Sequence, residues 1–167
     1  SDLHREKISP HIAVITNLYP DHLNRYSGME EYIGDKKAIF LYQKKEDYLV
    51  INKKDKILSE LIKEAKSQIR AFTQEDIPNN WHLKVLGVHN RFNAAAALKV
   101  AEILGVPESV SLEVLENFVG LPGRLEKIGV KNGVIYINDT TSTTPIATTM
   151  AIQALGDKNI VLLAGGN

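Results

Sequence analysis

The sequence predicts an α/β fold whose main sheet is parallel. Short runs of β-branched and other apolar residues alternate with helical stretches of roughly 10–15 residues, a spacing that favours parallel strands joined by right-handed crossovers. Two of these runs, residues 11–16 (HIAVIT) and 159–164 (NIVLLA), are almost continuously apolar, which is typical of strands buried on both faces of such a sheet. We therefore expect helices to pack against the sheet in layers.

Strands and helices alternate through the first half of the predicted fold. Residues 17–27 form a polar loop after the first strand, and Pro78-Asn79-Asn80 is a turn signal because Pro and Asn favour turn conformations. We expect strands at 11–16, 48–52, 69–73 and 83–86, and helices at 29–43 and 57–67.

Two further helices are predicted in the middle of the chain. Residues 90–104 contain four consecutive alanines, and alanine has the highest helix propensity. Gly105 suits the C-terminal cap of this helix, and Pro107 follows it. The next helix is expected at 111–118, whose first residue is a serine and therefore a good N-cap.

The pattern becomes richer in strands after residues 120–123 (GLPG), where we place a domain boundary. Asn132-Gly133 lies between two β-type runs, which is a strong hairpin signal. The last predicted strand has one helix before it and nothing after it, and the sequence begins abruptly with a polar segment that leads straight into a strand. We therefore expect both ends of the chain to be cuts within a longer protein. The elements expected here are strands at 125–130, 134–138 and 159–164 and a helix at 145–155, and the predicted domains are 1–120 and 121–167.

The composition excludes several classes of function. Twenty Lys and Arg balance twenty Asp and Glu in the 167 residues, so the basic excess of a general nucleic-acid or membrane-surface binder is missing. The chain has no cysteine, which excludes disulfides, thiolate metal sites and cysteine nucleophiles. No apolar run reaches the ~18 residues of a membrane span, and no signal-peptide pattern opens the sequence. We expect a cytoplasmic protein without nucleic-acid or membrane partners.

Polar side chains that could bind a ligand follow the first strand. Asp21, His22, Asn24 and Arg25 lie within ten residues of its carboxyl end, the edge at which open α/β sheets bind ligands. These residues could contact a metal, a phosphate or a carboxylate. A solvated loop in which Asp21 caps a short turn explains them equally well.

Lys36 occupies an unexpected position on the first long helix. Met29, Ile33 and Phe40 lie at helical spacing, and Lys36 falls on the same stripe, whereas Lys37 points elsewhere and can be ordinary surface. A lysine on an apolar stripe must extend its ammonium to solvent, pair with a carboxylate or lose its charge by modification. Extension to solvent is the simplest of these three alternatives.

The start of the alanine-rich helix is a candidate nucleotide site. Asn90 and Asn93 are three residues apart, so both amides can project to one side, near backbone N–H groups that favour phosphates or a purine edge. Simple capping by Asn90 is the alternative, and it leaves Asn93 and His89 unexplained.

A fourth candidate group lies on both sides of the predicted hairpin. Arg124 could pair with a phosphate, and Asp139 could accept a hydrogen bond from a ribose hydroxyl. Five hydroxyl residues, 140–144, follow Asp139 and precede Pro145, so an ordinary Ser/Thr-rich helix cap is the alternative. The chain contains no Gly-rich phosphate loop of the P-loop or dinucleotide type.

Taken in order along the chain, these four groups resemble the Mur ligase family, the ATP-dependent amino-acid ligases of peptidoglycan synthesis. The resemblance covers essentially the whole chain. It implies that 1–120 is the later half of an ATPase-type central domain, with the P-loop lying upstream, and that 121–167 begins a Rossmann-like C-terminal domain. The Gly-Leu-Pro and Asn-Asp-Thr sequences resemble most the branch of the family that adds D-glutamate.

The resemblance also implies a role for individual residues. Thr140-Thr141 stand where that branch often has Ser-Lys, so the lysine that would make one phosphate or substrate contact is missing here, although a hydroxyl could still donate at that position. The resemblance implies a Mg²⁺ site formed by Lys36 as a carbamate and by His22, which would also lie near the acyl-phosphate centre. It implies adenine contacts from Asn90 and Asn93, and phosphate and ribose contacts from Arg124 and Asp139. It places Thr143 near the incoming amino acid.

The implied reaction is activation of a carboxylate by ATP to an acyl phosphate, followed by attack of an amine. Its substrates would be UDP-N-acetylmuramoyl-L-alanine and D-glutamate, with ATP and Mg²⁺ as cofactors and a monomer as the working unit. We expect the chain to be inactive alone. Two alternatives stay open: a non-catalytic nucleotide-binding module, and a relative in the same family that adds another amino acid.

Overall fold

A computed structural model describes residues 2–19, 26–156 and 159–165 of the chain. Its main sheet has three parallel strands in the order β1-β2-β3, namely β1 (Ile12–Ile15), β2 (Tyr48–Asn52) and β3 (Gln68–Phe72). Ile12 pairs with Tyr48, which pairs in turn with Gln68. The three strands therefore end at one edge of the sheet, and the predicted parallel α/β fold is confirmed.

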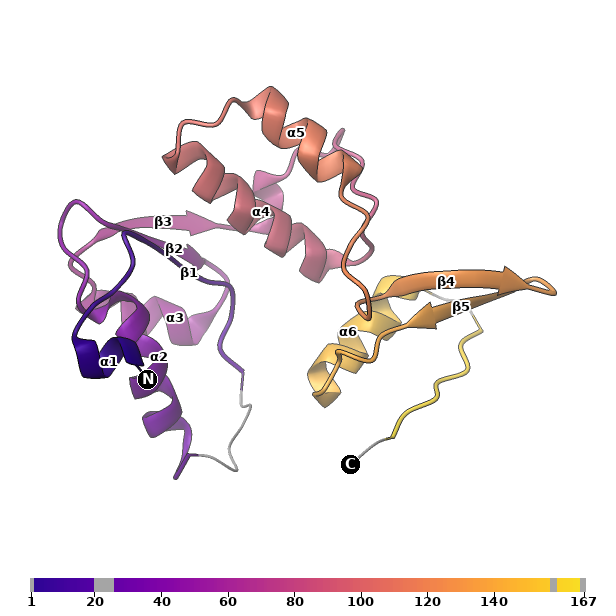
Figure 1. The fold of residues 1–167 in the computed structure, drawn as a ribbon, viewed down its shortest axis with the longest axis horizontal. Coiled ribbons are helices and arrows are strands. Elements are labelled where there is room, and N and C mark those ends of the chain that lie inside the picture. Colours follow the sequence, from indigo (N-terminus) through magenta and orange to yellow (C-terminus); the bar gives the residue numbers. More distant parts are fainter. Residues whose placement is uncertain (1, 20–25, 157–158, 166–167) are drawn as a thin grey trace.

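Each face of the sheet is covered by helices (Figure 1). The helices α2 (Met29–Leu41) and α3 (Lys56–Leu61) lie on one face, and α4 (Val88–Ile103) and α5 (Glu108–Asn117) lie on the other. A short N-terminal helix, α1 (Asp2–Glu6), which the sequence analysis does not predict, packs near α2. None of the helices in the described residues is long and apolar enough to span a membrane.

The central strand β2 supplies side chains to both hydrophobic layers. Leu49 and Ile51 are buried in a cluster with Phe40 of α2, whereas Val50 is buried in a second cluster with the alanines of α4 and Phe72. Alternate residues of a strand point to opposite faces of its sheet, so this uninterrupted apolar strand serves both layers. The pattern explains why a continuous apolar run, rather than an alternating one, marks the strand in the sequence.

The second part of the chain begins with an antiparallel hairpin. The strands β4 (Glu126–Lys131) and β5 (Val134–Asn138) are joined at Asn132 and Gly133, which both have positive φ, as the Asn-Gly signal predicts. The helix α6 (Pro145–Leu155) follows, and Thr144 caps it by accepting a hydrogen bond from the backbone N–H of Ala147. The hairpin and α6 are confirmed, and the domain boundary near 120–123 stays a prediction.

Two predicted strands are wrong. Residues 83–86 have no strand partner; their neighbourhood is instead tied to α5, because the His82 N–H donates to Glu116 and Lys84 Nζ donates to Asn117. Residues 159–164 also lack strand geometry, and Leu163 is 92% exposed. A parallel strand requires a neighbour to accept its hydrogen bonds, and neither segment has one among the residues that the structure describes.

Two predicted helices have a boundary that differs from the structure by three or more residues. The helix expected at 57–67 is shorter, because α3 ends at Leu61 and tightens into one 3₁₀ turn at Ile62–Glu64. The helix expected at 111–118 begins three residues earlier, at Glu108 after Pro107. Ser111 is therefore an interior residue rather than the N-cap, and its buried hydroxyl has no hydrogen-bond partner among the described residues.

Candidate functional site

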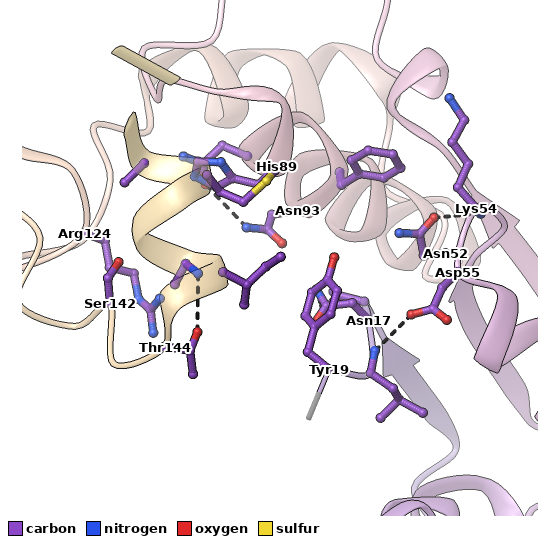
Figure 2. A pocket seen from close by; sticks show the side chains of 18 of the residues that line it. Asn17, Tyr19, Asn52, Lys54, Asp55, His89, Asn93, Arg124, Ser142 and Thr144 are labelled. Carbon is purple, nitrogen blue, oxygen red and sulfur yellow. Dashed lines mark hydrogen bonds between the residues drawn. The ribbon is translucent and has the colours of Figure 1, made fainter. Parts of the chain in front are cut away.

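A cleft of about 860 Å³ lies at the carboxyl edge of the main sheet. One wall consists of residues that follow β1 and β2, another is the first part of α4, and the third comes from the hairpin region and α6 (Figure 2). This is the edge at which open α/β sheets bind ligands. Two of the four candidate groups from the sequence, those at the start of α4 and around the hairpin, therefore meet in one cleft, although they are far apart in the chain.

The α4 wall presents two asparagines to the cleft. Gly87 is the N-cap of α4 and supplies no side-chain cap, so the interpretation of Asn90 as a simple cap is wrong. Asn90 Nδ2 donates to the carbonyl of Leu86 at 2.7 Å, and Asn93 Nδ2 donates to Asn90 Oδ1 at 3.3 Å. These two bonds orient both amides, and Asn93 is exposed toward the cleft (Figure 2).

Asp139 organises the opposite wall. Its Oδ1 accepts a hydrogen bond from the Leu125 N–H at 2.9 Å, and its Oδ2 accepts one from Ser142 Oγ at 2.5 Å. Leu125 has a φ of 46°, a conformation that is costly for a leucine. Asp139 thus joins the start of the hairpin to the segment that follows it, and it lies beside the exposed Arg124 in the lining of the cleft.

Arg124 and Asp139 have different freedom to bind a ligand. No carboxylate pairs with the Arg124 guanidinium among the ion pairs of the described residues. The carboxylate of Asp139 is already engaged with two donors, but its oxygens have further lone pairs and can accept another hydrogen bond. The pair therefore offers an available cation and a fixed acceptor on one wall.

Thr143 does not line the cleft, whereas its neighbours Ser142 and Thr144 do. Its side chain is exposed, and Thr144 is the residue that caps α6. The Ser/Thr-rich segment is therefore partly a helix cap, as the alternative interpretation proposed. The role of Thr143 near an incoming amino acid stays a prediction.

Lys36 is exposed rather than buried in the apolar stripe. Its Nζ lies 5.4 Å from the ring centroid of Tyr32, one helical turn earlier. Tyr32 is itself buried and lines the cleft. Of the three alternatives for Lys36, the structure shows the side chain extended to solvent, with its ammonium near the Tyr32 ring. Its modification to a carbamate stays a prediction.

Lys37, expected to be ordinary surface, is the more buried of the two lysines. Its side chain is 21% exposed and forms an ion pair with Glu64 at 2.5 Å.

Asp21, His22, Asn24 and Arg25 lie outside the described residues. Among the residues that are described, no three His, Cys, Asp or Glu side chains come together to hold a metal ion.

The turn after β2 also lines the cleft, although none of its residues is among the candidates predicted from the sequence. Asn52, Lys54 and Asp55 occupy this turn (Figure 2). Lys54 Nζ bonds Glu75 at 2.6 Å and lies 5.9 Å from the Phe92 ring centroid. This ion pair lowers the pKa of Glu75 to about 2. Ligands bind at the carboxyl ends of parallel strands, which is why the polar residues after β1 are candidates. Asn52, Lys54 and Asp55 lie at and after the carboxyl end of β2, so the same rule could have identified them.

His89 is a half-buried imidazole at the junction of α4 and α6. Its Nδ1 is buried and has no hydrogen-bond partner within the described part of the chain. A Cβ built on Gly87 would lie 2.7 Å from His89 Cε1 and 2.6 Å from Ala154 Cβ, so the ring and α6 both pack on this glycine. Burial lowers the pKa of His89, and the negative charge of Asp139 opposes this shift.

We predict that His89 titrates below its ordinary pKa of 6.5. Because the unfolded chain then binds a proton that the folded chain does not, the free energy of unfolding should fall as the pH drops below about 6.5, until the folded-state pKa is reached. An NMR titration of the ring carbons measures the pKa. His89→Gln should remove this part of the pH dependence, with His82→Gln as a matched control at an exposed histidine. A pKa of 6.5 or above would contradict the prediction.

Sequence relatives place these features in a known family. A family model described as the Mur ligase middle domain matches residues 2–80. A UDP-N-acetylmuramoylalanine--D-glutamate ligase from Symbiobacterium thermophilum is 34% identical over 95% of this chain and 40% of its own length. An enzyme of the same name from Streptococcus agalactiae serotype Ia is also 34% identical, with 96% of this chain and 40% of the relative covered. The chain thus spans about 40% of the length of these relatives.

Solved structures agree with these relatives. MurF from Acinetobacter baumannii has a TM-score of 0.77 and 26% identity, over 90% of this chain and 38% of that chain. The UDP-N-acetylmuramate-alanine ligase MurC from Thermotoga maritima has a TM-score of 0.66 over 92% of this chain and 40% of that chain, and at 22% identity it supports the fold alone. The ordered motifs, the shared fold and the sequence matches lead to one conclusion: residues 2–80 of this chain belong to the Mur ligase family, as a middle domain.

Proposed function

We propose that this chain is part of an ATP-dependent ligase that joins D-glutamate to UDP-N-acetylmuramoyl-L-alanine through an acyl phosphate. The observation that supports this proposal most directly is the cleft, because it brings Asn90 and Asn93 opposite Arg124 and Asp139. The names of the relatives support the choice of D-glutamate. We further propose that the whole protein acts as a monomer in the cytoplasm.

The two walls suit the two ends of a nucleotide. The amide groups of Asn90 and Asn93 can donate to and accept from a purine edge. Across the cleft, the guanidinium of Arg124 can form charge-assisted bonds with phosphate oxygens, and Asp139 can accept from a ribose hydroxyl. The positive charge of this guanidinium, if it is held near the transferring phosphoryl group, would stabilise the negative charge that develops there.

The proposed Mg²⁺ site is not complete in the described residues. Lys36 with a free ammonium cannot bind a metal, His22 lies outside the described residues, and no cluster of three metal-binding side chains is present among the others. These residues alone therefore do not fit a metal ion. We propose that carbamylation of Lys36 accompanies assembly of the whole site.

We predict that the complete protein forms ADP and phosphate only when ATP, UDP-N-acetylmuramoyl-L-alanine and D-glutamate are all present. L-Lysine and diaminopimelate, tested in place of D-glutamate, should not support turnover. Turnover with one of these amino acids would assign another branch of the family. Nucleotide binding without turnover on any amino acid would identify a non-catalytic module. Either result overturns the proposed function.

A matched pair of variants tests the assigned nucleotide wall in the same assay. Asn93→Ala should raise the KM for ATP by about 2–10-fold, the value of one hydrogen bond. Asn117→Ala removes a comparable exposed amide from α5, whose Nδ2 donates to the Glu113 carbonyl outside the cleft, and should leave this KM unchanged. Equal effects of the two substitutions would remove the support for a nucleotide on α4.

A further inference from the structure

The Asp55 carboxylate connects two backbone segments that form adjacent parts of the cleft wall. Its Oδ1 accepts hydrogen bonds from the N–H groups of Ile57 and Leu58 at 2.9 and 3.2 Å, which caps α3. Its Oδ2 accepts a hydrogen bond from the N–H of Leu18 at 3.0 Å. Leu18 is 37 positions earlier in the chain, in the segment that follows β1. One side chain thus satisfies donors of both segments.

The turn that precedes Asp55 holds the carboxylate in place. Asn52 Oδ1 accepts a hydrogen bond from the Lys54 N–H at 2.9 Å, and the Asn52 carbonyl accepts one from the Asp55 N–H at 3.2 Å. These local bonds define the path of the chain from β2 into α3. Asp55 itself is half-buried and lines the cleft (Figure 2). Its side chain therefore has a preformed position before any ligand binds.

Within the described part of the chain, the segment held by Asp55 is anchored by one buried side chain. Leu18 is buried in the same hydrophobic cluster as Leu58, whereas Asn17 and Tyr19 on either side of it are exposed and line the cleft. The hydrogen bond to Leu18 fixes the backbone between these two side chains. Losing it would leave a part-buried N–H without its acceptor and would let Asn17 and Tyr19 move relative to β2.

We propose that Asp55 is a positioning residue of the cleft, which aligns the wall formed by Asn17 and Tyr19 with the rest of the site through the Leu18 N–H. A capping role alone needs one acceptor oxygen, which Ser, Thr or Asn also provides. Only a carboxylate supplies two acceptor oxygens, so the second bond distinguishes this residue from an ordinary N-cap. The consequence for catalysis rests on the proposed ligase function.

Two substitutions separate the hydrogen bond to the Leu18 N–H, which we call the tether, from the cap of α3. Asp55→Ser keeps one acceptor for α3 and loses the bond to Leu18, whereas Asp55→Ala loses both. In hydrogen exchange on the complete protein, the Leu18 amide should exchange at least about tenfold faster in both variants. The amides of Ile57 and Leu58 should lose protection only in Asp55→Ala. An unchanged Leu18 amide in Asp55→Ser would overturn the tether, whether or not the protein proves to be a ligase.

Activity of the same variants tests the positioning role. Both should lower kcat/KM about tenfold and to a similar extent, because misplaced groups reduce the rate of reaction. Asp55→Ala should also have a Tm about 2–4 °C below that of Asp55→Ser, since only it lacks the cap. Ser59→Ala, which removes an exposed hydroxyl that bonds the Asp55 carbonyl, is the matched control and should retain activity. Losses of activity that follow Tm across the variants would show a merely structural role.

Discussion

Replacing Gly87 with alanine is expected to destabilise the protein by about 2–6 kcal/mol, through backbone strain and steric overlap together. Gly87 has a φ of +92°, which residues with a side chain rarely adopt. Its new Cβ would also lie 2.6 Å from Ala154 Cβ and 2.7 Å from His89 Cε1. Because Ala154 belongs to α6, relief of the overlap must move α6 away from α4 and widen the cleft.

Gly105→Ala is the matched control for this effect. Gly105 also has a positive φ, of +72°, but its added Cβ would meet no atom within 4 Å. Strain alone should then cost about 1–2 kcal/mol. Urea denaturation of the two variants measures the difference, and Ala154→Gly combined with Gly87→Ala should recover part of the loss. Equal losses at the two glycines would show that α6 does not pack on Gly87.

Asp139→Ala is expected to weaken binding of ATP to the complete protein by about 10–100-fold, the value of a hydrogen bond to a charged group. The substitution also removes the acceptor for the Leu125 N–H and for Ser142 Oγ. Without the first of these bonds, the positive φ of Leu125 is no longer stabilised, so the backbone that carries Arg124 should become more mobile. Calorimetric titration with ATP measures the affinity.

Asp139→Asn separates charge from hydrogen bonding at this position. The amide oxygen can still accept from Leu125, and the Ser142 hydroxyl can turn to accept from the amide nitrogen. We expect a smaller loss of ATP affinity than for alanine. Since the charge of Asp139 raises the pKa of His89, the asparagine variant should lower that pKa further. An unchanged ATP affinity in both variants would exclude Asp139 from the nucleotide site.

Local sequence patterns were sufficient to predict those elements whose structure depends on residues that are close together in the chain. The run YLVIN at 48–52 is apolar because both faces of β2 are buried, and Asn132-Gly133 adopts the positive φ values that its composition favours. The run at 83–86 is as apolar as a strand, but no pattern within it shows whether a neighbouring strand exists. Its connections to α5 depend on residues about 34 positions away.

The candidate site shows the same division. Asn90 and Asn93 could be identified because a helix start makes two nearby amides chemically conspicuous. The bond from Asp55 to Leu18 could not be predicted, since the two residues are distant in the sequence. Helical periodicity gives the angle of Lys36 around the helix, but it does not show that this side chain is exposed and lies near the Tyr32 ring.

The shared use of β2 by two hydrophobic clusters makes the two helical layers thermodynamically dependent on each other. A volume change at Phe40, on the α2 side, is relieved in part by a shift of the β2 backbone, and that shift alters the space available to Val50 on the α4 side. Substitutions on opposite faces of the sheet should therefore have non-additive effects on stability. Sequence changes in one layer would be tolerated best when the other layer changes with them.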